Sequence, residues 1–162
     1  MNFFFDGLLI VLLMIIFFQD LKFRAIHIVL PVILGALGIY LFLERGLQLQ
    51  IVLYNIIFLA LTFLGLFLYL SLKNRSVTNI LSAVGMGDLL FFLAITPFFS
   101  TSNFILFFIG GMVFTIIIHS ILIKFTTHFE LIPLAGFVAL FMILLKVTSY
   151  VVDFDFFKTV WI

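Results

Sequence analysis

Residues 51–72 read IVLYNIIFLALTFLGLFLYLSL, a run of 22 residues that contains no charged side chain. A helix needs about 20 mainly apolar residues to cross the roughly 30 Å hydrocarbon core of a bilayer. This run is therefore predicted to be a transmembrane helix.

The composition of the whole chain agrees with a location in lipid. Of its 162 residues, 66% are hydrophobic and only 9% are charged, and the mean hydropathy is +1.47. A soluble domain carries about a quarter charged residues. So few charges cannot cover a surface that faces water, and the chain is predicted to be an integral membrane protein.

Further apolar runs lie on both sides of the first one. Six segments are predicted to span the membrane: residues 3–18, 26–43, 51–72, 80–99, 104–123 and 131–145. The connections between them are short and polar, and no long linker or internal repeat is present. We expect one all-α domain over residues 1–162, a polytopic membrane protein with a bundle of about six transmembrane helices.

Several classes of function are excluded by the composition. A net charge of +1 offers no basic surface for nucleic acid. The chain has no cysteine, which excludes disulfides, thiolate metal sites and cysteine nucleophiles. The three histidines lie far apart in the sequence: His27, His119 and His128. We therefore predict neither a metal site nor a cofactor.

Positive charges concentrate in alternate connections. Lysine or arginine follows the first, third and fifth predicted spans, at Lys22, Arg24, Lys73, Arg75 and Lys124. On the other side, Arg45, Lys146 and Lys158 are accompanied by acidic residues. Because Lys and Arg are enriched on the cytoplasmic side of membrane proteins, we predict a multi-pass protein of the cytoplasmic (inner) membrane with both termini outside.

The acidic residues differ in whether water can solvate them. Five of the seven lie at span ends or in loops, where we expect water to solvate them: Asp6, Glu44, Glu130, Asp153 and Asp155. Asp88 lies inside the apolar run 80–99. A charged carboxylate in the hydrocarbon region costs about 2.5–3.5 kcal/mol, so such a residue is a candidate functional group. The alternative is an aspartate that packs between helices through a hydrogen bond.

Two glycines precede this aspartate, in the order Gly85-Met86-Gly87-Asp88. Glycine weakens a helix and permits both close backbone approach and positive φ angles. One interpretation is that these glycines keep the start of the span open for water and an extended peptide. The other is a seam of small residues for helix packing.

The predicted topology brings a second carboxylate to the same side of the membrane. Asp20 closes the first span, and on its own it resembles a solvated helix end. Asp88 lies in the first half of the fourth span, which starts from the same side. Two carboxylates that are close together share a proton. One can then activate water as a general base while the other polarises a peptide carbonyl, as in an aspartic protease.

These residues resemble the type IV prepilin peptidases, membrane aspartyl proteases with a Gly-x-Gly-Asp motif. The family has an aspartate at the cytoplasmic end of a span, a short basic loop and then Ile-Pro-Asn-x-Leu. Here Asp20, the basic loop, Ile26 and Leu30 match in spacing, while His27 and Ile28 replace Pro-Asn. The second motif matches at Gly85, Gly87 and Asp88, with Leu90 where members often have lysine. The stretch Ile132-Pro133-Leu134-Ala135-Gly136-Phe137 is similar to the segment that opens the last span of the family.

The resemblance implies an aspartic endopeptidase that removes the leader peptide of prepilin or pseudopilin substrates at the cytoplasmic face. Asp20 and Asp88 are the implied catalytic residues, Gly85 and Gly87 the supporting motif, and membrane lipid the surroundings. Lys22 and Arg24 are candidates for substrate contact or for tuning the charge of the two acids. The chain looks like the compact form, without the cysteine-containing region that larger members associate with methylation.

Three other interpretations stay open. Presenilin-like peptidases also use Gly-x-Gly-Asp, but they are longer and typically have tyrosine before the first aspartate, where this chain has Gln19. Buried acids also serve proton-linked transporters. A non-catalytic scaffold of a pilus or secretion assembly is the third.

Overall fold

The computed structural model describes residues 3–74, 85–125 and 132–151. Within these ranges the chain is helical and contains no strand. The elements are α1 (Phe3–Phe23), α2 (Val29–Glu44), α3 (Leu49–Asn74), α5 (Met86–Ile95), the short 3₁₀ helix η1 (Thr96–Phe98), α6 (Thr101–Phe125) and α7 (Leu134–Val151). The predicted all-α membrane bundle of about six helices is confirmed.

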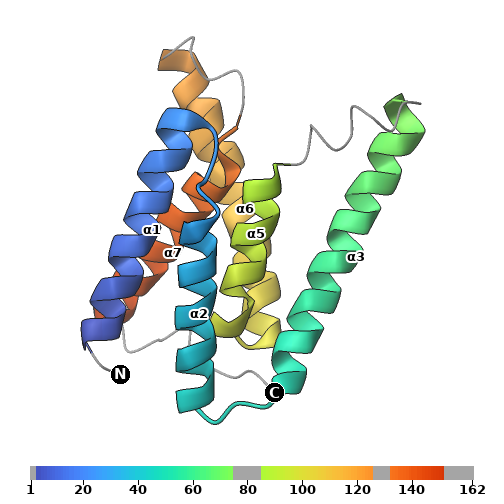
Figure 1. Cartoon of the computed structure of the whole chain (residues 1–162). Coiled ribbons are helices and arrows are strands. Elements are labelled where there is room, and N and C mark those ends of the chain that lie inside the picture. The colour runs from blue at the N-terminus through green and yellow to red at the C-terminus, as the bar shows by residue number, and fades with distance from the viewer. Residues whose placement is uncertain (1–2, 75–84, 126–131, 152–162) are drawn as a thin grey trace.

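Four of the helices are long and apolar enough to cross a membrane: Phe4–Phe23, Leu49–Lys73, Thr101–Lys124 and Leu134–Val151. The apolar helices Val29–Glu44 and Met86–Phe98 are shorter. Residues 80–84, the start of the predicted fourth span, lie outside the described residues. Successive described helices run in opposite directions through the bundle (Figure 1).

Two predicted helix boundaries need correction. The first span was expected to end at residue 18, yet α1 continues to Phe23 and so includes Asp20. The last span was expected over residues 131–145, with residues 147–162 either extending it or lying at the interface, and the helix runs from Leu134 to Val151. Its first hydrogen bond runs from the Phe137 N–H to the Pro133 carbonyl at 3.1 Å, and a proline disfavours helical conformation at the residue before it. The helix ends later because Lys146, which marked the predicted end, is buried inside the protein.

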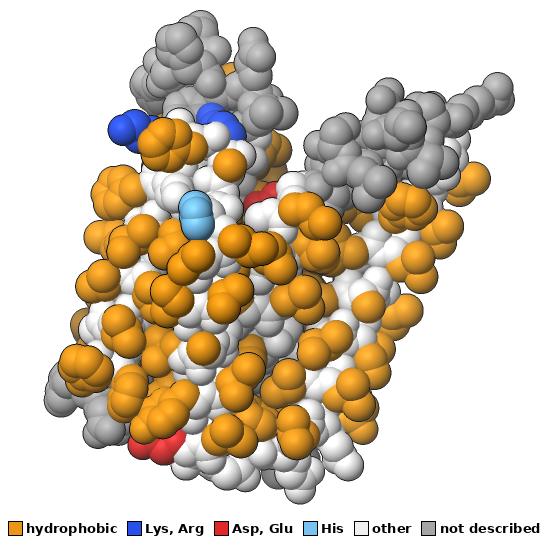
Figure 2. Space-filling model, viewed as in Figure 1, with side chains coloured by type: hydrophobic (Ala, Val, Ile, Leu, Met, Phe, Trp, Pro, Cys, Tyr) orange, Lys and Arg blue, Asp and Glu red, His pale blue; other side chains and the backbone are white. Residues whose placement is uncertain are grey.

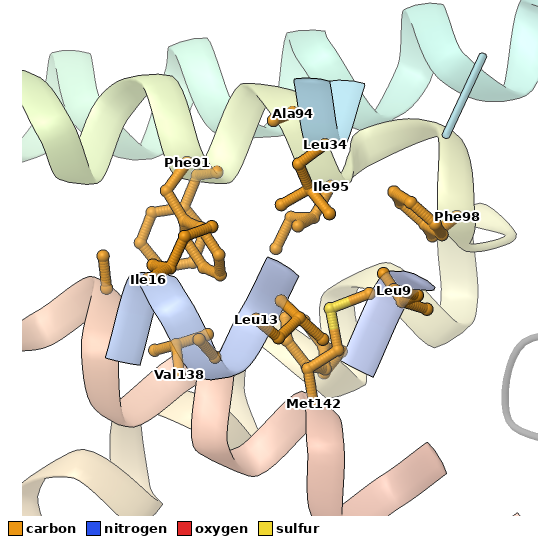
Figure 3. Packing of buried hydrophobic residues seen from close by; sticks show 14 of the residues in the cluster. Leu9, Leu13, Ile16, Leu34, Phe91, Ala94, Ile95, Phe98, Val138 and Met142 are labelled. Carbon is orange, nitrogen blue, oxygen red and sulfur yellow. The ribbon is translucent and has the colours of Figure 1, made fainter. Parts of the chain in front are cut away.

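The core lies where α1 packs against α7 on one side and against α2 and α5 on the other. Figure 3 shows Leu13 and Ile16 of α1 between Phe91 of α5 and Val138 of α7. Along α1, the buried residues recur every three or four positions, which places them on one face of the helix. The buried residues are Asp6, Leu9, Leu12, Leu13, Ile16 and Asp20.

Helix α3 is attached to the bundle by its first half. Asn55 is fully buried, and its amide donates to the carbonyls of Thr96 at 2.9 Å and Phe99 at 3.0 Å. These carbonyls belong to the region where Pro97 ends the regular helix of α5. From residue 60 to residue 73, no residue of α3 is buried, and this half leans away from the other helices (Figure 1).

Candidate functional site

The first carboxylate of the site lies at the end of α1. Asp20 belongs to the last turn of the helix and is only 5% exposed. The helix ends because Arg24 has a left-handed conformation with φ of 55°, and its N–H donates to the Asp20 carbonyl at 3.0 Å. Glycine usually occupies this position, since a side chain there costs about 1–2 kcal/mol. The turn at Arg24 directs the chain back towards α2.

The loop that follows is held by hydrogen bonds to both neighbouring helices. The His27 N–H donates to the Gln19 side-chain oxygen at 2.9 Å, and the His27 carbonyl accepts the Leu30 N–H at 2.9 Å. His27 thus links the end of α1 to the start of α2. This role of Gln19 was not predicted from the sequence.

The second carboxylate lies in the first turn of α5. The carbonyl of Gly85 accepts the N–H groups of Asp88 at 3.0 Å and Leu89 at 3.2 Å, which starts the helix. A Cβ atom on Gly85 would lie 2.8 Å from the Asp88 Oδ2, closer than real Cβ contacts. A Cβ on Gly87 would lie 3.4 Å from the Ile26 Cβ.

The two glycines therefore differ in the space that they provide. At Gly85 an added Cβ would collide with the Asp88 carboxylate, whereas at Gly87 it would make ordinary van der Waals contact with Ile26. The φ of Gly85 is −61°, so this glycine does not adopt the positive φ that glycine permits. The positive-φ glycine of the described residues is Gly46, far from the site. Gly85 makes room for the carboxylate itself, while Gly87 lies against Ile26 in the loop after α1.

The start of α7 brings the two carboxylates together. The Ala135 N–H donates to Asp88 Oδ1 at 3.1 Å, and the Gly136 N–H donates to Asp20 Oδ2 at 2.7 Å. The first N–H groups of a helix have no partner within the helix and attract negative charge. Here two successive amides of α7 each bind one aspartate. The acids are therefore neighbours, close enough to interact electrostatically.

The close contact at Gly136 leaves little room for a side chain. A Cβ atom there would lie 3.1 Å from both the Cβ and the Oδ2 of Asp20, and 3.4 Å from the Phe17 carbonyl oxygen. The roles of Ala135 and Gly136 were not predicted from the sequence. The available signal was a proline, then one leucine and two small residues, at the start of an apolar helix.

A cavity of about 650 Å³ lies over the two acids. Its lining residues are Asp20, Arg24, Ala25, Ile26, Gly85, Met86, Gly87, Asp88, Ile132 and Leu134. The predicted catalytic and supporting residues thus share one cavity with Arg24. Lys22 is not part of it, since its side chain is exposed and its Nζ lies over the Phe23 ring, 5.1 Å from the centroid.

A second polar cluster lies at the opposite end of α1 and α7, and it corrects an expectation. Asp6 was predicted to be solvated, but it is 4% exposed. Its carboxylate pairs with the Lys146 Nζ at 3.1 Å and accepts a hydrogen bond from the Tyr150 hydroxyl at 2.9 Å. We call Asp6, Lys146 and Tyr150 the distal polar cluster. Burial requires such pairing, because an unpaired charge in the interior is costly.

Basic side chains gather at the end of the molecule that holds Asp20 and Asp88. Lys22, Arg24, Lys73 and Lys124 all lie in or beside the ends of α1, α3 and α6, and these helix ends share one end of the bundle. Figure 2 shows Lys and Arg near the end of α1 and hydrophobic side chains along the length of the visible face.

Within the ranges that the structure describes, no three His, Asp or Glu side chains lie close enough together to hold a metal ion. Comparisons of the chain with protein-family models, with curated proteins and with solved structures found no match.

Proposed function

We propose that this membrane protein is an aspartic endopeptidase that removes the leader peptide from prepilin-like substrates. One observation carries the proposal: two acids from different helices, the buried Asp20 and the half-buried Asp88, meet at successive amides of α7 beside a cavity. Isolated acids at helix ends face water and do not need such an arrangement. Two neighbouring carboxylates at a cavity fit general acid–base catalysis.

The proposed reaction uses the two acids in different protonation states. The ionised carboxylate takes a proton from water, and the water oxygen bonds to the scissile carbonyl carbon. The protonated acid gives its proton to the carbonyl oxygen. When the intermediate collapses, the C–N bond breaks, the amide nitrogen receives a proton from the protonated acid, and a hydroxyl of the intermediate returns a proton to the other carboxylate. The amides of Ala135 and Gly136 support this cycle, because N–H groups at a helix start stabilise negative charge on the acids.

The substrate class and the orientation follow from charge and from the family resemblance. Positive residues at the site end favour a cytoplasmic location for that end, by the enrichment of Lys and Arg on that side. We therefore propose that the cavity opens near the cytoplasmic face of the inner membrane and that both termini lie on the other side. The leader peptide of a prepilin precedes an apolar helix and reaches the bilayer surface at this level.

A proton-linked transporter has less support. It needs a continuous polar path across the membrane. Between Asp20 and Asp6, the buried face of α1 carries Leu9, Leu13 and Ile16, and α7 contributes Val138 and Met142 to the same core. This apolar core favours local chemistry at one end over conduction through the bundle.

The decisive experiment is co-expression with a candidate prepilin, with leader removal followed by mass spectrometry. Asp20→Asn and Asp88→Asn should each lower processing by about 100-fold or more, since positioned acid–base groups contribute about 10²–10⁴-fold. Glu44→Gln is the matched control, because Glu44 is an exposed carboxylate at the other end of the bundle. Normal processing by both aspartate variants would reject the peptidase and favour a non-catalytic scaffold.

A further inference from the structure

The helices α1 and α7 contact each other through polar groups at both ends of their interface. At one end Asp20 accepts the Gly136 N–H at 2.7 Å, and at the other Asp6 binds Lys146 at 3.1 Å and Tyr150 at 2.9 Å. Asp6 and Asp20 are fourteen positions apart in the sequence, and so are Gly136 and Tyr150. The two polar contacts therefore match in spacing on the antiparallel helices.

We propose that the distal polar cluster (Asp6, Lys146 and Tyr150) sets the register of α1 against α7 and thereby holds Asp20 opposite Gly136. The three residues are then positioning residues for the catalytic acid, and this consequence for catalysis rests on the proposed function. The statement about register does not rest on it, because register can be measured without any substrate.

The interface between the two ends has little to fix the register by itself. The buried apolar residues of α1 are Leu9, Leu12, Leu13 and Ile16, and they share one core with apolar residues of α7. Lipid tails are as apolar as these side chains, so association in a bilayer gains little from one apolar register over another. A buried polar or charged pair in an apolar interface is the best-attested means of selecting one register.

Sliding the helices by one turn would move them about 5.4 Å relative to each other. The ion pair between Lys146 and Asp6 spans 3.1 Å, and both side chains are almost fully buried. Such a shift would leave two charges unpaired among apolar side chains, which is strongly unfavourable. An apolar pair in their place would carry no such penalty.

The distance of the cluster from the site has a functional reason. At the site, α1 is attached to α7 through the Asp20 carboxylate, which is the proposed reacting group. Water or substrate bound to this carboxylate competes with the Gly136 amide. The distal polar cluster takes no part in the chemistry, so it can keep the register while Asp20 exchanges partners.

Cysteine pairs can report the register, because the natural chain has no cysteine. The native register is reported by Asp20→Cys with Gly136→Cys, since a Cβ at position 136 would lie 3.1 Å from the Asp20 Cβ. The shifted register is reported by Asp20→Cys with Ala139→Cys, about one turn further along α7. With the natural cluster, disulfides should form almost entirely in the first pair.

The test replaces the ion pair in two ways. Lys146→Met alone leaves Asp6 unpaired and can prevent folding. The main variant is therefore Asp6→Leu with Lys146→Met. Such an exchange of a buried ion pair for apolar residues is often neutral or stabilising. This variant should raise the ratio of shifted to native disulfide about threefold or more. The reversed pair, Asp6→Lys with Lys146→Asp, should restore the native ratio. Lys124→Met is the control, because Lys124 is an exposed lysine of α6.

An unchanged disulfide ratio in the apolar variant would overturn the proposal.

Processing is measured separately in chains that keep Asp20 and Gly136. There the apolar variant should lower kcat about tenfold or more with little change in KM, because small misplacements of catalytic groups are costly. A shifted ratio with normal processing would overturn the catalytic role alone. Failure of the proposed function appears differently, as absence of processing by the natural chain.

Discussion

Asp20 and Asp88 accept hydrogen bonds from successive backbone amides at the start of α7, at 2.7 Å and 3.1 Å. Neither carboxylate is on α7, and the two residues are on helices that are far apart in the sequence. The start of a third helix thus acts as the common attachment point of both acids. This relationship makes the last helix part of the site.

Convergence of the two acids predicts that they can be crosslinked. In the chain carrying Asp20→Cys and Asp88→Cys, we expect a disulfide, or a bridge by a short bis-thiol reagent, in native membranes. A disulfide requires Cα atoms within about 7 Å. Each single variant is the control, since any product there must be intermolecular. Absence of a bridge with both reagents would contradict the proposed dyad.

Gly136 should not tolerate a branched side chain. In Gly136→Val the added atoms meet Asp20, and overpacking of this kind costs about 1–3 kcal/mol. We expect a lower stability in a denaturation series in mild detergent and at least about a tenfold loss of processing, because the amide can no longer hold Asp20.

The matched control for this glycine is Gly7→Val on α1, where a Cβ atom would have no neighbour within 4 Å. Its processing should stay normal. Equal effects of the two substitutions would show that general destabilisation, and not contact with Asp20, is responsible.

Arg24 and Lys22 should differ in their effect on activity. The Arg24 side chain lines the cavity, and its charge acts on Asp20. Arg24→Gln should change the processing rate roughly threefold to tenfold, equivalent to about 1 kcal/mol in activation free energy. Lys22→Gln should change it less than about twofold, because exposed charges are well screened. A larger effect of Lys22→Gln would indicate that this lysine contacts the substrate.

Asn55 should be important for the attachment of α3. Asn55→Leu removes the donor for the carbonyls of Thr96 and Phe99, and we expect a loss of about 1–2 kcal/mol in the free energy of unfolding. Thr62→Val on the same helix is the control, since the Thr62 hydroxyl bonds only within α3, to the Phe58 carbonyl at 2.8 Å. Similar stability of both variants would contradict the role of Asn55.

Several features of the site could be predicted from the sequence because they depend on local composition. A carboxylate within an apolar run stands out, since its burial is costly wherever the helix packs. Asp88 and its two glycines were identified on this basis, and Asp20 through the alternation of helix directions. The role of Gly85 was harder to anticipate, because its missing Cβ makes room for the Asp88 carboxylate and not for an unusual backbone angle.

The distal polar cluster was missed for a different reason. Asp6 shares one face of α1 with Leu9, Leu13, Ile16 and Asp20, which the spacing of three or four residues implies. In a soluble helix, the contrast between apolar and polar faces shows which side is buried. A membrane helix is apolar on every side, so the pattern does not tell whether Asp6 faces water, lipid or another helix.

The sequence by itself determined that this chain is a bundle of membrane helices and which two acids need an explanation. Long apolar runs suffice for that, because a backbone in lipid must satisfy its hydrogen bonds within each helix. The tertiary structure decided that Ala135 and Gly136 hold the acids, that Arg24 and not Lys22 lines the cavity, and that Lys146 pairs with Asp6. These contacts depend on the rotation and register of each helix against its neighbours, and an apolar sequence in an apolar solvent leaves both undetermined.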